Sequence, residues 1–186
     1  MKKAAFIILL IGMLSAHNLK AQNKVSFFEE HIDFSIDKDY FTINGIYSFC
    51  NHSGVKVNQT ILFPFAVEVT EIDSIRIVNL KTSSGIGFNP SGKLISFTIP
   101  ILPNDTVDIN LFYRQKTSVS NKYIITSTKA WGKPLEKADY SLTADKDISI
   151  KTFSYTPDSF NKKRKIYFWH KENFMPETDF IVTLND

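Results

Sequence analysis

The sequence predicts an all-β protein: a two-sheet antiparallel β-sandwich, immunoglobulin-like or jelly-roll-like, with about ten strands. Apolar residues alternate at every second position, which is typical of strands with one buried face. Turn residues recur about every ten positions, and no helical periodicity is sustained after Ala21. Strands with one apolar face need a second layer, and we prefer a sandwich to a barrel because the hairpins are local.

The clearest alternation runs through residues 40–50 and 55–63. Between them lies Asn51-His52-Ser53-Gly54, whose side chains and glycine favour a turn. Residues 27–36 are expected to form the preceding strand, which Asp37-Lys38-Asp39 joins to residues 40–50 as a hairpin.

The later strands are bounded by glycine, proline, asparagine and aspartate. Asn89-Pro90-Ser91-Gly92 predicts a turn, and Asp145-Lys146-Asp147 predicts a hairpin. A short helical turn is expected at residues 133–137 or 176–179. The remaining strands are expected at residues 72–80, 86–88, 93–99, 107–114, 122–128, 138–143, 148–155, 164–170 and 180–184.

Residues 1–21 have the layout of a secretory signal peptide. Lys2 and Lys3 precede a short apolar core, and Ala21 offers a small residue at the cleavage point. We expect cleavage before Gln22, which leaves residues 22–186 as a single β-sandwich domain without an integral membrane span. The signal resembles those of Gram-negative bacteria, so a secreted, periplasmic or cell-envelope location is expected.

The net charge of +3 comes from the predicted signal, because three of the 22 basic residues and none of the 19 acidic residues precede Gln22. A neutral mature chain gives no general reason to bind nucleic acid. Cys50 is the single cysteine, so an internal disulfide is excluded and a small buried side chain is the expected role. No cofactor is expected.

Glu29, His31 and Asp33 would share one face of their strand, opposite Phe28, Glu30 and Ile32. Two carboxylates and an imidazole on one face could hold a divalent metal or supply a general base, as in a metal-dependent hydrolase or lyase. The alternative is the solvated outer face of an edge strand. The sequence has no His-Glu-x-x-His, Gly-x-Ser-x-Gly, P-loop, Cys-x-x-Cys or EF-hand pattern.

Three residues are candidates for ligand binding. Trp131 lies in the loop Trp131-Gly132-Lys133-Pro134, where it could stack on a sugar or close one end of the sandwich. Trp169 and His170 follow the basic run Lys162-Lys163-Arg164-Lys165. Basic residues near aromatic ones can bind nucleic acid or acidic glycans, but a charged loop entering a core strand is the simpler interpretation.

Several short patterns resemble a set of exported bacterial β-sandwich proteins of unknown function. The resemblance implies a two-sheet fold and an envelope location, and it brings no catalytic residues. The patterns are Glu30-x-Ile32-x-Phe34, Gly45-x-Tyr47-x-Phe49-x-Asn51, Phe63-Pro64-Phe65, Phe112-Tyr113-Arg114-Gln115, Trp131-Gly132-x-Pro134 and Phe174-x-Pro176-x-x-Asp179.

Three functions are consistent with the sequence. We expect an exported non-catalytic protein that binds or assembles with an envelope partner, either a protein or a glycan. A carbohydrate-binding module that uses Trp131 is the first alternative. A metal-dependent enzyme built around Glu29, His31 and Asp33 is the second.

Overall fold

The computed structural model describes residues 24–185, and the predicted signal peptide lies outside that range. The described chain is all-β, as predicted, with two 3-10 helices, η1 (Val69–Glu71) and η2 (Thr126–Trp131). None of its helices has the length and apolar character of a membrane span. The strands are β1 (Val25–Ile36), β2 (Tyr40–Asn51), β3 (Val57–Pro64), β4 (Ile72–Asn79), β5 (Ser84–Gly85), β6 (Asn89–Ser91), β7 (Leu94–Ile101), β8 (Thr106–Lys116), β9 (Ser120–Tyr123), β10 (Leu135–Ala144), β11 (Ile150–Phe153), β12 (Ser159–Asn161), β13 (Ile166–Phe174) and β14 (Phe180–Leu184).

One layer is a mixed eight-stranded sheet in the order β12-β13-β10-β1-β2-β8-β4-β5. β1 and β2 form the predicted hairpin, and Asp37 accepts hydrogen bonds from the backbone of Asp39 and Tyr40 in its turn. On its other side, β1 pairs in parallel with β10. The prediction of a purely antiparallel fold is therefore wrong, because alternation along a strand indicates its buried face but not its partner.

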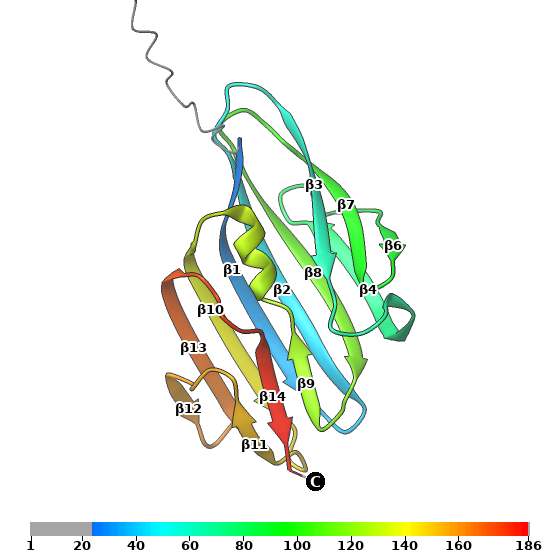
Figure 1. Ribbon diagram of the computed structural model, residues 1–186, viewed down its shortest axis with the longest axis vertical. Helices are drawn as coiled ribbons and strands as arrows, with labels where there is room; N and C mark the ends of the chain where they lie inside the picture. Colours follow the sequence, from blue (N-terminus) through cyan, green and yellow to red (C-terminus); the bar gives the residue numbers. More distant parts are fainter. Residues whose placement is uncertain (1–23, 186) are drawn as a thin grey trace, which may run out of the picture.

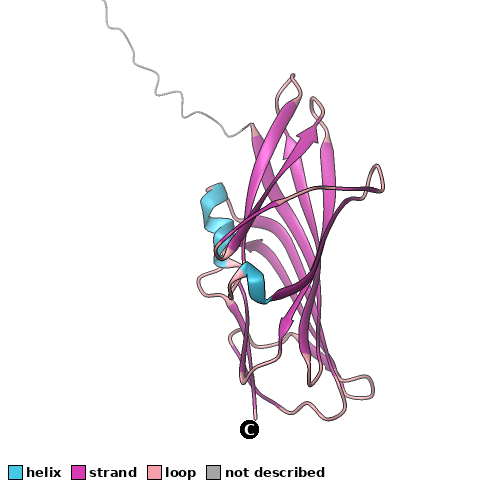
Figure 2. Cartoon of the chain, turned by 90° about the vertical axis from the view of Figure 1, so that its right-hand side faces the viewer, coloured by secondary structure: helices cyan, strands magenta, loops and turns pink. Residues whose placement is uncertain are grey.

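The second layer consists of two three-stranded sheets, β3-β7-β6 and β11-β14-β9, with η2 beside them. Both small sheets and η2 lie in front of the large sheet in Figure 1, and Figure 2 shows the layers from the side. The predicted two-sheet sandwich of about ten strands is thus too simple. Strands of two or three residues, such as β5 and β6, are too short to show an alternating pattern.

Several local predictions also differ from the structure. The strands around Asp145-Lys146-Asp147 do not form a hairpin, because β10 pairs with β13 whereas β11 pairs with β14. The predicted strand at residues 122–128 ends at Tyr123, and η2 follows it. Gly132 ends η2 in the left-handed conformation, with φ 71°, which glycine adopts without steric cost. Neither region expected to hold a helical turn, 133–137 or 176–179, is helical in the structure.

The buried side of β1 changes phase at a β-bulge. Phe27 pairs with Phe49 and Glu29 with Ser48, so Phe28 is the extra residue. Before the bulge the odd-numbered side chains Val25 and Phe27 are buried, whereas after it the even-numbered ones are. The bulge therefore keeps Phe27 in the core on the same side as Glu30 and Ile32, whereas regular alternation would have put Phe28 there.

Aromatic side chains join the two layers. Phe34 of β1 stacks on Phe180 of β14, with ring centroids 4.5 Å apart, and on Phe41 at 5.5 Å. Trp169 contacts Phe180 edge-on at 5.0 Å and donates an indole hydrogen bond of 2.9 Å to the carbonyl of Tyr155. Such aromatic pairs contribute beyond the apolar area that they bury.

Candidate functional site

Polar side chains form rows across β1, β10 and β13 on the face of the large sheet that points away from the small sheets. The register places His31 beside Asp139 and Asp139 beside His170. In the same way, Asp33 lies beside Ser141. Because strand alternation keeps one face free of core packing, these side chains are available to solvent and ligands.

Asp139 is the centre of the middle row. It accepts hydrogen bonds from His170 Nδ1 at 2.6 Å and from Lys137 Nζ at 2.7 Å. Partial burial raises the pKa of Asp139, but these two hydrogen bonds outweigh that effect and the net shift is downward. The hydrogen bond to Asp139 raises the pKa of His170. The row thus favours an ionised aspartate and a protonated histidine.

The other polar contacts fix the neighbouring side chains. Ser141 donates a 2.5 Å hydrogen bond to Asp33, and His31 Nε2 lies 3.5 Å from the same carboxylate. Asp158 accepts from the backbone N–H of His170 at 2.7 Å and from Lys171 Nζ at 2.9 Å. The face is therefore an ordered network of donors and acceptors.

One groove of about 910 Å³ on the sheet face is lined by the histidine, aspartate and serine side chains of this network: His31, Asp33, Asp139, Ser141, Asp158 and His170. Phe168, which is 41 % exposed, stands at the β13 side. At the β8 side the guanidinium of Arg76 lies over the ring of Phe112, 5.5 Å from its centroid. We call this groove the outer groove and define it by His31, Asp33, Asn44, Arg76, Phe112, Asp139, Asp158, Phe168 and His170.

The predicted common face of Glu29, His31 and Asp33 agrees with the structure, where Glu30 and Ile32 are buried on the opposite face. His31 and Asp33 line the outer groove, but Glu29 does not; it lies 3.5 Å from Lys137 Nζ. Within residues 24–185, no three His, Cys, Asp or Glu side chains are grouped as metal ligands. The geometry thus gives no support to the predicted metal site.

The ligand-binding candidates lie in three different environments. His170 lines the outer groove. Trp169 also borders the outer groove, but its side chain is only 2 % exposed and packs into the core, so it offers almost no surface to a ligand. Trp131 packs against the opposite, buried face of the large sheet, where its ring centroid lies 5.9 Å from that of Phe27 and 5.4 Å from that of Phe49. It does not share a site with His170.

Trp131 lines a small cavity between the layers, which we call the inner pocket. Its volume is about 40 Å³, and its walls come from β1, β2, β3, β7, β8, β9 and η2. Glu30, 2 % exposed, belongs to this pocket, and the hydroxyl of Tyr140 donates a hydrogen bond to its carboxylate. Burial raises the pKa of Glu30 to about 7, and the hydrogen bond from Tyr140 opposes that shift only partly.

Sequence reasoning missed Asp139, Phe168 and Glu30 as site residues. The first two come together with His31 only through the β1–β10–β13 pairing, which no local pattern encodes. Glu30 did carry a signal, because it is in phase with Ile32 and Phe34 on the apolar side of the strand. A charged residue in that phase is a candidate for a buried ionisable group.

No family model and no curated protein matches the sequence. Solved structures do match the fold. A Legionella pneumophila protein described as a "putative nutrient binding protein" has a TM-score of 0.67 at 12 % identity, over 88 % of this chain and 67 % of that chain. The M1 zinc metallopeptidase of Deinococcus radiodurans has a TM-score of 0.52 at 8 % identity, over 87 % of this chain. This chain spans 43 % of that enzyme, and both likenesses concern the fold alone.

Proposed function

We propose that this protein is a non-catalytic binding protein of the bacterial cell envelope, and that its outer groove holds a hydroxyl-rich ligand such as a short glycan. The observation that carries the proposal is the groove itself, about 910 Å³ of continuous space lined by ordered polar side chains between two aromatic residues. The envelope location is supported by the signal-like pattern of residues 1–21.

The chemistry of the outer groove suits hydroxyl groups. Asp33 and Asp139 offer acceptors, Arg76 offers donors, and Asn44 offers both. Exposed Phe168 provides a flat apolar surface on which a sugar ring can stack. Because most of the groove's carboxylates already have partners within the network, a neutral polar ligand fits it better than a strongly charged one.

The fold likeness to a protein described as nutrient-binding is consistent with a binding role. The likeness to an M1 zinc metallopeptidase does not extend to its metal chemistry, because this sequence has no His-Glu-x-x-His pattern. A binding role, unlike the catalysis of a zinc peptidase, does not require this pattern.

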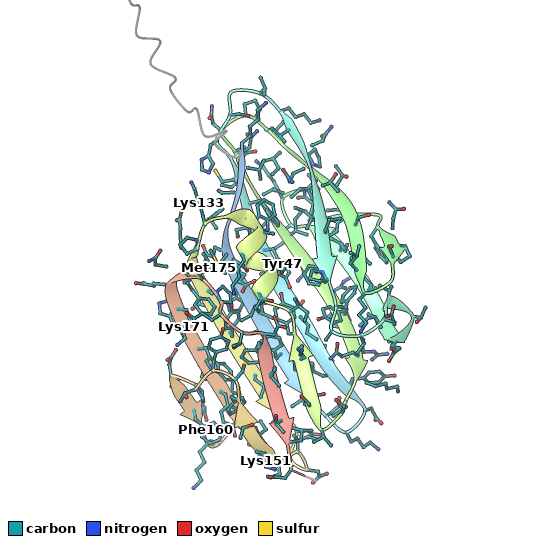
Figure 3. The ribbon with its side chains drawn as sticks, viewed as in Figure 1. Tyr47, Lys133, Lys151, Phe160, Lys171 and Met175 are labelled. Atoms are coloured by element: carbon teal, nitrogen blue, oxygen red, sulfur yellow. The ribbon has the colours of Figure 1, made fainter. Side chains whose placement is uncertain are left out.

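The test is a glycan array and a calorimetric titration of its strongest ligand, with wild-type protein and the Phe168→Ala variant. We expect Phe168→Ala to weaken binding about tenfold through the lost ring contact. Phe160→Ala is the matched control, because Phe160 is 46 % exposed at the same edge but does not line the groove (Figure 3). Equal losses in both variants, or capture of a protein partner with no glycan retained, would contradict the proposal.

A further inference from the structure

The inner pocket combines one buried carboxyl group with a shell of aromatic rings. Phe27 and Phe49 stack at 5.2 Å, Trp131 lies within 6 Å of both, and Tyr47 meets Phe63 edge-on at 5.6 Å. Tyr47 lies near the middle of the molecule, close to η2 (Figure 3). These rings come from strands of both layers, so the two-layer fold itself builds the shell.

The carboxyl group has no cationic partner in the pocket. Among the described residues that line the inner pocket, none is Lys, Arg or His. The hydroxyl groups near Glu30 are those of Tyr140, which donates to it, and of Tyr47 and Tyr123, which are hydrogen-bonded to each other at 2.8 Å. An ionised carboxylate buried without a counter-charge is unfavourable, and a cation would compensate it.

We propose that the inner pocket is a second binding site, independent of the outer groove, and that it takes a small organic ammonium ion. The positive head would lie against the Glu30 carboxylate and the faces of the surrounding aromatic rings. Cation–π contacts with Trp, Tyr and Phe are how proteins recognise alkylated ammonium groups. A neutral ligand of the same size would leave the carboxylate uncompensated.

The size of the pocket limits the ligand. A volume of about 40 Å³ holds about three water molecules, which suits a ligand of three or four heavy atoms. Methylated ammonium ions fall in this range, whereas amino acids and sugars are too large. The pocket is therefore distinct from the outer groove in ligand chemistry as well as in position.

The inner pocket adjoins a surface groove on its Trp131 side, which is the proposed entry for the ligand. Leu62, Pro64, Ser127 and Trp131 line both the inner pocket and an adjoining surface groove of about 550 Å³. Leu62 is 64 % exposed, so its side chain can change rotamer without breaking core packing. Among the described residues, Lys24 is the charged residue that lines this groove, and Gln59, Thr60 and Ser127 add polar groups there.

Isothermal titration of the full-length protein with trimethylammonium chloride at pH 8 tests the proposal. We expect saturable one-site binding to the wild-type protein and at least tenfold weaker binding to Glu30→Gln, which keeps the shape and one acceptor but removes the charge. 2-Propanol, a neutral molecule with the same branched skeleton of four heavy atoms, should not bind. Phe168→Ala, in the outer groove, should bind trimethylammonium as the wild type does.

The pH dependence of binding to the wild-type protein supplies a measurement that does not depend on a variant folding. Affinity for trimethylammonium should fall about tenfold for each pH unit below 7, as Glu30 becomes protonated. Tyr47, Tyr123 and Tyr140 also face this carboxyl group, but they stay neutral in that range because burial raises the pKa of each. Absence of binding, equal affinity of folded Glu30→Gln, or a flat profile from pH 5 to 8 would overturn the proposal.

Discussion

Folding moves the carboxyl group of Glu30 from water into the inner pocket, and stability should depend on pH for that reason. The pKa rises from 4.5 to about 7 on folding, so between these values the folded state holds a proton that the unfolded state has lost. The contribution of this proton to the stability of the folded state is fully present below pH 4.5 and is lost as pH rises to 7. We expect the free energy of unfolding to fall by about 3 kcal/mol over this interval.

Urea denaturation of the wild-type protein and Glu30→Gln at several pH values measures this effect. The variant cannot ionise at position 30, so its free energy of unfolding should lack the decline due to Glu30 between pH 4.5 and 7. At pH 8 its free energy of unfolding should be higher than that of the wild type. Parallel profiles for the two proteins would show that Glu30 is not the group that titrates.

Gly45 is needed because the ring of Tyr47 lies across it. A Cβ atom at position 45 would clash with the Tyr47 hydroxyl and lie only 2.6 Å from its Cε2 atom. Gly45→Ala must therefore displace a buried ring that is hydrogen-bonded to Tyr123. We expect the free energy of unfolding, measured by thermal denaturation, to be about 1–3 kcal/mol lower than that of the wild type, which is typical of overpacking. Gly54→Ala is the control, because nothing lies within 4 Å of its added Cβ, and it should unfold like the wild type.

Alternation along a strand predicted where most strands lie but not how they pair. β1 and β2 extend one or two residues beyond their predicted bounds, because their ends, Val25 and Asn51, pair with each other. The β1–β10 pairing joins Ile36 to Ala144, segments far apart in the sequence, and no local signal specifies it. The same limit applies to the site. The common face of His31 and Asp33 was predictable from alternation, but the contact of this face with Asp139 depends on the β1–β10 pairing and was not.

The β-bulge in β1 offers a test of how the strand sets its two faces. Phe28 and Glu29 together oppose Ser48, so deletion of Phe28 should give a regular strand that keeps Phe27 and Glu30 inward. We expect this variant to fold cooperatively with a native circular dichroism spectrum.

Deletion of Asp33, in the regular part of β1, is the contrasting variant. In the wild-type protein Ile32, Phe34 and Ile36 are all buried on one face. Without a bulge to absorb the deletion, Phe34 and Ile36 must move to the face opposite Ile32. Such a phase change places core side chains in water, so this variant should not fold. If deletion of Phe28 destabilises the protein more than deletion of Asp33 does, the bulge has a role beyond setting which side chains of β1 face the core.

The large sheet separates the two proposed sites, because each strand sends alternate side chains to opposite faces. On β1, His31 and Asp33 point to the outer groove while Glu30 points to the inner pocket. On β10, Asp139 lines the outer groove, and the hydroxyl of Tyr140 donates a hydrogen bond to Glu30. Two ligands can therefore bind at once without touching. Strand backbones paired on both sides are rigid, so little conformational coupling is expected between the faces.

The independence of the two sites can be tested with the double variant Phe168→Ala/Glu30→Gln and with the wild-type protein. Each substitution should weaken only its own ligand, and saturating trimethylammonium should change glycan affinity less than twofold. Calorimetric titration of each ligand, alone and with the other present, measures this coupling. A change of tenfold or more would mean that the sheet transmits binding from one face to the other, and the rows that join β1, β10 and β13 would then be the segments to examine by hydrogen exchange.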